Sequence, residues 1–343
     1  MKKDLLKAIE DAGLVGRGGA AYPVAMKWSA VLESLKKVKG GYIVANGAEG
    51  EPGVFKDGYI LEKYPETFLD GLLLANNFLG DLKIIKIYLF LDSDYYKKYS
   101  KSLKTLLSKK KFINIASKVV FFAKPLDAGY IGGEESAMLN IIEGKRAVPR
   151  LRPPYPTSCG LNNLPTLVNN IETLYNVALV SEDKYEGKRF YTINGATKKP
   201  GVFYYPADWS LEKVLKMSGN YPNFPFFVQI GGQASGEVFN SEQLDIPAES
   251  SASIMIYDKE TTKEERLVKH WISFYHNNSC GQCTSCREGT YRLFEMINAK
   301  EYDRELFWDI VENLTETSFC ALGASLPIPL LSYHNNIKKY GRV

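Results

Sequence analysis

The sequence of 343 residues is short of the features that mark several large protein classes. It has no run of eighteen apolar residues, which excludes a helix that spans a bilayer. Its 43 basic and 39 acidic residues leave a net charge of +4, too small a bias to indicate nucleic acid or a charged membrane as partner. No repeat and no low-complexity segment is present, which indicates a globular chain.

Histidine is also scarce. His270, His276 and His334 have neither a neighbouring carboxylate nor ligand spacing, so we assign them to structure or surface. No G-x-G-x-x-G follows a predicted strand, and an ordinary dinucleotide fold therefore has no fingerprint here. The Met-Lys-Lys-Asp start carries an early acid and no long apolar core, which predicts the beginning of a helix rather than a signal peptide.

Only five cysteines occur, but four of them are grouped. Cys280, Cys283, Cys286 and Cys320 form a C-x2-C-x2-C…C pattern, the ligand set of one [4Fe-4S] cluster, and Cys159 is left over. The alternatives are a structural zinc site, whose ligands usually come as two separated pairs, or disulfides. Cluster-spaced thiols predict a reducing, cytoplasmic location, either free or peripheral on the cytoplasmic face of the inner membrane within a complex.

Apolar patterning predicts three domains. Residues 1–185 are expected to form an α/β domain with buried parallel strands. A small β-grasp module is expected over 186–260, and a helical iron–sulfur domain over 261–343. The first domain is predicted to hold strands Tyr42–Ala45, Ile84–Leu91 and Val119–Phe122, helices Glu66–Leu79, Glu134–Ile142 and Val168–Leu179, and a lysine-rich amphipathic surface helix within Tyr95–Lys111.

Two segments of the first domain combine glycine with charge. Gly16, Arg17, Gly18, Gly19 and Lys27 lie in a stretch where backbone amides can form a nest for an anion, such as a phosphate. The alternative is ordinary turn chemistry.

A second segment follows the first predicted strand, where α/β sheets bind ligands. There Asn46, Glu49 and Glu51 offer amide and carboxylate groups to ribityl hydroxyls or a nicotinamide, or form an acidic solvated turn.

Two later segments place polar side chains at helix starts. Gly133 precedes a helix whose first turn holds Glu134 and Glu135, and a helix start favours anions. Asn169 and Asn170 follow a stiff proline-rich stretch. Each of these side chains either contacts a cofactor or caps its own helix.

The four segments and the cysteine motif, in this order, resemble the flavoprotein subunit of respiratory complex I. They are similar also to the diaphorase subunits of NAD-linked hydrogenases and formate dehydrogenases. The resemblance covers about Leu5 to Ser332, and its most specific strings are Cys280–Gly289 and Pro165–Thr173. It implies FMN, a [4Fe-4S] cluster and NAD(H) as substrate. It also implies two partners, a thioredoxin-like [2Fe-2S] subunit and a larger iron–sulfur subunit.

The resemblance also assigns roles to residues. It implies catalytic carboxylates near the nicotinamide at Glu51 and Glu135, and adenine contacts at Tyr22 and Tyr155. The implied FMN contacts are Gly16, Gly18, Lys27, Asn46, Glu49, Gly133, Asn169 and Asn170, with Arg17, Gly19 and Glu134 beside them in the same segments.

The chain departs from the family at several of these places. Ala48 replaces a flavin-facing aspartate, and Gly58 replaces an arginine. Ala30 removes one of two stacking faces for the adenine, and base stacking is worth about 1–3 kcal/mol per ring. Two alternatives therefore remain. Electrons enter from a ferredoxin, a flavodoxin or a neighbouring subunit, or the chain is a degenerate scaffold.

Overall fold

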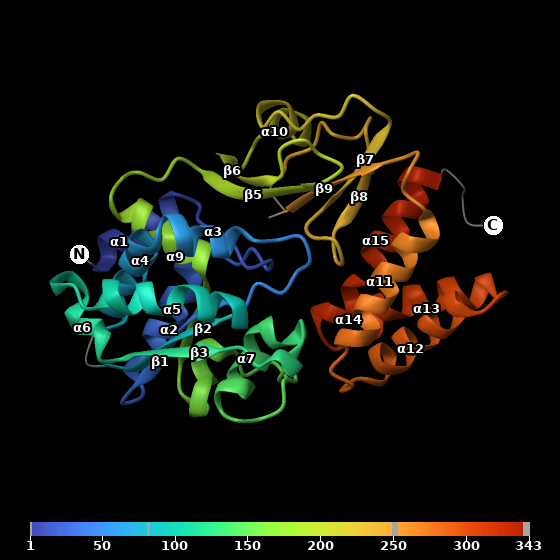
Figure 1. Cartoon of the computed structure of the whole chain (residues 1–343). Helices are drawn as coiled ribbons and strands as arrows, with labels where there is room; N and C mark the ends of the chain where they lie inside the picture. The colour runs from blue at the N-terminus through green and yellow to red at the C-terminus, as the bar shows by residue number, and fades with distance from the viewer. Residues whose placement is uncertain (1, 81–82, 249–252, 339–343) are drawn as a thin grey trace. The chain divides into compact units, whose positions relative to one another are not determined.

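The computed structural model describes residues 2–80, 83–248 and 253–338, and divides into two compact units. Unit 1 comprises Met1–Gly50 and Phe55–Lys188, and unit 2 comprises Glu51–Val54 and Arg189–Val343. The predicted α/β domain and helical C-terminal region are both present (Figure 1). The finer division into three domains at 185 and 260 stays a prediction.

Unit 1 is built on a four-stranded parallel sheet of order β3-β2-β1-β4 (Figure 1). Its strands are β1 (Gly41–Gly47), β2 (Ile84–Leu91), β3 (Val119–Ala123) and β4 (Thr166–Asn170). Its helices are α1 (Lys2–Asp11), α2 (Val24–Lys36), α3 (Lys56–Lys63), α4 (Pro65–Leu79), α5 (Ser93–Leu107), α6 (Ile113–Ala116), α7 (Glu135–Ile142), α8 (Pro156–Cys159) and α9 (Ile171–Ser181).

The predicted helix Val168–Leu179 begins too early. Residues up to Asn170 form strand β4, which pairs with β1, and helix α9 begins at Ile171. A short buried apolar run fits strand and helix equally well, and pairing with β1 decides for the strand. Gly71 of α4 lies against the backbone of Leu174 in α9, where any side chain would overlap it, so these two helices pack closely.

Unit 2 contains a mixed five-stranded sheet of order β6-β5-β9-β7-β8. Strands β5 and β9 are parallel, while β7 runs antiparallel to both β8 and β9. The elements are β5 (Lys188–Gly195), β6 (Gly201–Pro206), α10 (Leu211–Met217), β7 (Phe226–Ile230), β8 (Glu237–Asn240) and β9 (Ser253–Asp258). The Ser210 hydroxyl caps α10, accepting from the Lys213 amide at 3.4 Å.

Helices complete unit 2: α11 (Glu264–Asn278), α12 (Thr284–Asn298), α13 (Arg304–Thr317), α14 (Ala321–Ser325) and α15 (Pro327–Tyr333). They join the mixed sheet through specific contacts. The Trp271 indole donates to the Gln233 carbonyl at 2.9 Å, and the Val238 amide donates to Ser332 at 2.9 Å. Within the described residues, no helix is both long and apolar enough to cross a membrane.

Candidate functional site

The amides predicted to contact a flavin gather at the carboxyl end of the unit 1 sheet. Asn46 and Asn170 lie opposite each other in strands β1 and β4, and Asn170 donates to the Asn46 carbonyl at 3.3 Å. The Asn46 side chain donates to the Gly133 carbonyl at 3.0 Å. Asn169 faces helix α2 and accepts from the Trp28 indole at 2.9 Å. The structure therefore holds these amides in defined orientations.

Glu49 stands beside this group. Its carboxylate accepts from the backbone amide of Asp57 at 3.0 Å to each oxygen, from the amide of Gly58 at 3.4 Å, and from the Tyr95 hydroxyl at 2.7 Å. Burial raises the pKa of Glu49 to about 7, and the Asp57 carboxylate adds to the rise. Glu49 is partly accessible, so it can still present an oxygen to a ligand.

Next to Glu49, three buried charged side chains and one half-buried amide form a group that we call the Lys56 cluster: Lys56, Asp57, Glu172 and Asn170. The lysine ammonium lies 2.6 Å from Asp57, 3.2 Å from Glu172 and 3.2 Å from the Asn170 amide oxygen. Asn170 donates to Asp57 at 2.6 Å. Burial lowers the pKa of Lys56, but the carboxylates of Asp57, Glu172 and Glu49 together raise it, so the lysine remains charged.

The glycine-rich segment contributes fewer free amides than its composition suggests. The Gly16 amide donates to the Tyr22 carbonyl at 2.9 Å, and the Arg17 amide donates to the Thr173 hydroxyl at 2.9 Å. The Arg17 guanidinium donates to the Tyr185 hydroxyl at 3.0 Å. The segment is thus a folded turn, and its predicted role in binding an anion stays a prediction.

Two glycines leave space that a side chain would fill. A Cβ on Gly18 would lie 3.3 Å from the Cβ of Asn170, and one on Gly133 would lie 3.0 Å from the Ala48 carbonyl. Gly18 thus faces Asn170 of the amide group, and Gly133 faces Ala48, two residues after Asn46. This cradle and the oxygen and amide groups around it fit a flavin that needs close backbone approach and hydrogen bonds.

Charged side chains link helix α2 to the start of helix α7. Lys27 lies 2.7 Å from Glu135 and donates to the Val168 carbonyl at 3.0 Å. Arg152 forms an ion pair with Glu134 and lies 3.8 Å from Glu135. The structure therefore brings together three residues predicted to bind cofactors, with Arg152 completing the group.

Glu134 does what its alternative interpretation proposed. Its carboxylate caps helix α7, accepting from the amides of Ser136 at 2.9 Å and Ala137 at 2.8 Å. Asn170 likewise caps α9, accepting from the Glu172 amide at 2.9 Å. The remaining polar atoms of both side chains also have partners, namely Arg152 for Glu134, and Asn46 and Asp57 for Asn170. A cofactor contact stays a prediction for each. The predicted adenine contacts Tyr22 and Tyr155 are exposed, at 48% and 56%.

Glu51 belongs to unit 2, together with the short segment Glu51–Val54 that carries it. Its carboxylate accepts from the amides of Ala234 at 2.9 Å and Ser235 at 3.1 Å, and from the Ser235 hydroxyl at 3.1 Å. A side chain on Gly232 would collide with it. In this structure Glu51 is an anchor to the loop after β7, and its predicted role beside a nicotinamide stays a prediction.

Three of the four clustered cysteines lie at the starts of two helices of unit 2, and Cys280 lies in the loop between α11 and α12. Cys283 immediately precedes α12, Cys286 lies in its first turn, and Cys320 immediately precedes α14. Burial raises the pKa of the Cys286 thiol to about 11; the Ser279 hydroxyl opposes this, and Cys283, Cys320 and Cys280 add to it. The Cys286 thiol is therefore close enough to the other three thiols to respond to their charge.

Glycines allow this approach. A Cβ on Gly323 would lie 3.0 Å from the Cβ of Cys286, and Gly281 has φ +74°, which favours glycine. Across the described ranges, no three His, Cys, Asp or Glu side chains converge closely enough to hold a single metal ion. A four-iron cluster is larger than one ion and holds its thiolates farther apart. The cysteine ligands themselves remain a prediction.

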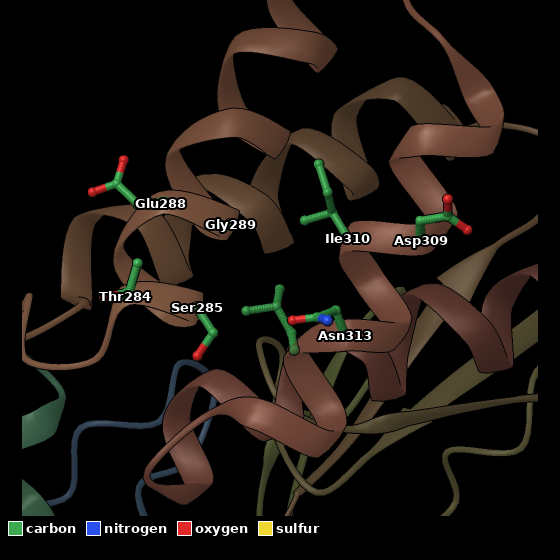
Figure 2. A pocket seen from close by; sticks show the side chains of 8 residues that line it. Thr284, Ser285, Glu288, Gly289, Asp309, Ile310 and Asn313 are labelled. Atoms are coloured by element: carbon green, nitrogen blue, oxygen red, sulfur yellow. The ribbon is translucent and has the colours of Figure 1, made fainter.

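A surface hollow of about 320 Å³ lies between helices α12 and α13 (Figure 2). Helix α12 contributes Ser285 and Glu288 to it, and helix α13 contributes Asp309 and Asn313. It contains none of the residues predicted to bind FMN, so the flavin site rests on the polar groups of unit 1 instead.

Two protein families match the chain, one almost entirely within unit 1 and the other within unit 2. Residues 9–179 match the family described as Nuo51 FMN-binding domain, and residues 266–340 match the NADH-ubiquinone oxidoreductase-F iron-sulfur binding region. The F subunit of the NADH-quinone oxidoreductase of Streptomyces coelicolor is 32% identical over 365 residues, which is 96% of this chain and 80% of the relative. Its counterpart in Aquifex aeolicus is 31% identical, covering 94% of this chain and 81% of the relative.

A solved structure is similar over almost the whole chain. It is a chain from the crystal structure of an NAD+-reducing [NiFe]-hydrogenase in the H2-reduced state, with a TM-score of 0.87 and 29% identity. The match covers 99% of this chain and 62% of the hydrogenase chain. The similarity does not extend to the rest of the hydrogenase chain.

Fold and matches together define a flavoprotein subunit with an FMN-binding domain and an iron–sulfur binding region. More particularly, the chain belongs to the family of the F subunits of NADH-quinone oxidoreductases. The resemblance inferred from sequence is thereby confirmed, and so are FMN and an iron–sulfur cluster as its cofactors.

Sequence analysis misses some residues of this site. It names neither Lys56 nor Asp57, yet they are buried, at 4% and 2% exposed. It assigns Tyr95 to a solvated helix, yet the Tyr95 hydroxyl reaches Glu49. A lysine and an aspartate next to each other after a predicted ligand-binding loop are the available signal for the buried pair. No sequence signal points to Tyr95.

Proposed function

We propose that this chain is the NADH-oxidising flavoprotein subunit of a larger oxidoreductase, passing electrons from FMN through a [4Fe-4S] cluster to a partner subunit. The observation that carries the proposal is the polar group at the carboxyl end of the unit 1 sheet. There Asn46, Glu49 and Asn170 meet beside the Gly133 carbonyl, in a domain of the FMN-binding family. When bound, a flavin accepts two electrons as a hydride and releases them singly.

The residues of unit 1 would divide this work. Asn46, Asn169 and Asn170 orient hydrogen-bonding groups toward the cofactor, and the glycines at 16, 18, 19 and 133 admit it closely. Lys27 supplies positive charge that Glu135 balances at 2.7 Å. Glu135, and Glu51 if it leaves its anchor, would orient a nicotinamide. Tyr22 and Tyr155 offer exposed rings to an adenine.

In unit 2, Cys280, Cys283, Cys286 and Cys320 would hold the cluster. The mixed sheet with helix α10 supports a β-grasp module of the soluble-ligand-binding type, because a parallel pair, β5 and β9, is flanked by further strands in a sheet with one short helix. We place this module at 186–260, between a cofactor domain at 1–185 and a helical iron–sulfur domain at 261–343.

Assembly and location follow from the same proposal. The partners would be a thioredoxin-like [2Fe-2S] subunit and a larger iron–sulfur subunit, and the complex would be cytoplasmic or peripheral on the cytoplasmic face of the inner membrane. The relatives named above are subunits of NADH-quinone oxidoreductase, and the hydrogenase is described as NAD+-reducing, which supports this setting.

Anaerobic titration of the purified, cofactor-loaded protein with NADH and then NADPH tests the proposal. We expect NADH to bleach the flavin absorbance and then the cluster absorbance. If only NADPH reduces the flavin, the substrate is NADPH rather than NADH, and the proposed electron transfer still holds. A chain that binds FMN and iron yet responds to neither nucleotide would contradict the proposal.

A second donor is favoured by one observation. Position 30 of helix α2 is alanine, so the predicted adenine site has fewer aromatic faces. If neither nucleotide reduces the flavin, a ferredoxin, a flavodoxin or a neighbouring subunit becomes the leading donor. Reduction by a chemically reduced ferredoxin would then distinguish this case from a scaffold without turnover.

A further inference from the structure

A tyrosine outside the predicted flavin residues contacts one of them. Strands β1 and β2 are neighbours, and the chain leaves both at the same edge of the sheet. Glu49 follows β1 by two residues, and Tyr95 lies in the first turn of α5, which begins just after β2. The Asp92 amide donates to the Gly47 carbonyl at 3.0 Å and so ties the two exits together.

The contact between these residues is specific. The Tyr95 hydroxyl donates to Glu49 Oε2 at 2.7 Å, a length typical of a charge-assisted hydrogen bond. Burial raises the pKa of Tyr95, and the Glu49 carboxylate raises it further, so the phenol keeps its proton and remains a donor.

Space for the tyrosine ring depends on a glycine. A Cβ placed on Gly58 would lie 2.6–2.7 Å from the ring and hydroxyl atoms of Tyr95, closer than atoms tolerate. Gly58 is the third residue of helix α3, and glycine is a poorer helix former than alanine. A glycine that weakens its own helix while making room for an aromatic ring indicates that the ring position matters.

We propose that Tyr95 is a positioning residue of the flavin site, fixing the Glu49 carboxyl group at the carboxyl end of β1, and that Gly58 provides the space for its ring. This inference rests on the proposed function, since Glu49 is a predicted FMN contact. Tyr95 acts through Glu49 and need not touch the cofactor.

The charges around Glu49 define what Tyr95 changes. Asp57 and Lys56 of helix α3 face Glu49 with opposite effects: the aspartate favours its protonated form and the lysine its charged form. Tyr95 donates to the carboxylate and favours the charged form, and its other titratable neighbours are Asp57 and Tyr99. Removing the phenol hydroxyl should therefore move ionisation of Glu49 to higher pH.

Tyr95→Phe tests this, with Tyr99→Phe as its matched control. Tyr99 lies one helical turn further along α5, and its hydroxyl donates to Glu62 at 3.1 Å instead. FMN affinity would be measured across about pH 5.5 to 8.5 by the quenching of FMN fluorescence on the full chain. Because Tyr95→Phe loses a hydrogen bond to a charged group, its FMN affinity should be about tenfold weaker near neutral pH. The pH at which the affinity curve inflects should also be higher than in the wild type. Tyr99→Phe should match the wild type.

A measurement without FMN separates this inference from the proposed function. Carbon-13 NMR of glutamate carboxyl groups follows Glu49 directly in FMN-free protein, with Glu49→Gln identifying its resonance. We expect Tyr95→Phe to raise the pH at which this resonance titrates. If wild type and Tyr95→Phe titrate alike, the inference is overturned. If the wild type binds no FMN at all, the proposed function fails, while the NMR result still decides the role of Tyr95.

Gly58→Ala gives an independent check. Alanine favours the helix, so α3 should persist, but its Cβ must displace the ring. We expect the variant to reproduce the weaker FMN binding of Tyr95→Phe, and to have no effect once Tyr95→Ala has removed the ring. Full FMN affinity in Gly58→Ala would contradict the inference.

Discussion

The Lys56 cluster in unit 1 and the four cysteines in unit 2 are both dense groups of ionisable side chains, but they are held in different ways. Lys56, Asp57, Asn170 and Glu172 satisfy one another at 2.6–3.2 Å. The cysteines are free thiols, and Cys286 has only the Ser279 hydroxyl at 3.4 Å as a polar side-chain partner among the described contacts. The Lys56 cluster is thus held by ion pairs and hydrogen bonds between side chains, whereas three of the cysteines are held by their places at helix starts, with Cys283 before α12, Cys286 in its first turn and Cys320 before α14.

The largest effect should come from removing a cluster ligand. Cys286→Ser is expected to abolish iron binding, because a thiolate is the ligand that iron–sulfur clusters require and a serine hydroxyl does not supply one. Iron content and the visible absorbance of purified protein measure this. Cys159→Ser, at a cysteine outside the group, should keep its iron; equal iron in both variants would remove Cys286 from the ligand set.

Breaking the Lys56 cluster should cost stability instead. Lys56→Met leaves Asp57 and Glu172 buried without their cation, and removing one partner of a buried ion pair costs about 3–5 kcal/mol. Urea unfolding of FMN-free protein measures it. Lys36→Met is the control, since Lys36 and Glu33 form an exposed pair worth about 0–1 kcal/mol. If both variants lose a similar free energy of unfolding, burial does not explain the stability contributed by the Lys56 cluster.

A smaller effect should appear with pH. The folded-state pKa of Glu49 is raised from 4.5 to about 7, so the folded chain binds the proton more tightly than the unfolded chain. Its contribution to stability is therefore present below about pH 4.5 and is lost as the pH rises to about 7. Relative to Glu49→Gln, the wild type should lose on the order of 2 kcal/mol over this window, after allowing for partial solvent access. A constant difference between their unfolding free energies would refute the raised pKa.

The smallest effect concerns the nucleotide. Ala30→Phe adds a ring to helix α2, and one stacked ring is worth about 1–3 kcal/mol. We expect tighter NADH binding by roughly tenfold, measured as the NADH concentration that half-reduces the flavin. Ser29→Phe, on the neighbouring position of the same helix, serves as the control. Unchanged NADH affinity in Ala30→Phe would place the adenine elsewhere.

How far the sequence predicts this molecule depends on the distance over which an interaction acts. Strand Ile84–Leu91 and helix Glu66–Leu79 follow from local patterning, and the structure agrees to within one residue. Local patterning does not predict strand β8, because four residues carry too little pattern. Tyr95 lies in a segment predicted to be a solvated face; its contact with Glu49 spans 46 residues, and the space for its ring is made at Gly58.

The segment Glu51–Val54 has a practical consequence for cutting the molecule apart. The chain leaves unit 1 after Gly50, packs four residues into unit 2, and returns at Phe55. Within unit 2 these residues are well held: Asn194 donates to the Gly53 carbonyl at 2.8 Å, and Gln233 donates to the Pro52 carbonyl at 3.1 Å. A fragment that ends at Lys188 would keep this segment but lose the residues that hold it.

A fragment that begins at Arg189 would lack the segment and expose the loop that Glu51 covers. Expressing either half alone therefore calls for a redesigned loop at 51–54, and co-expression of two fragments cut at 188 is the arrangement that preserves it.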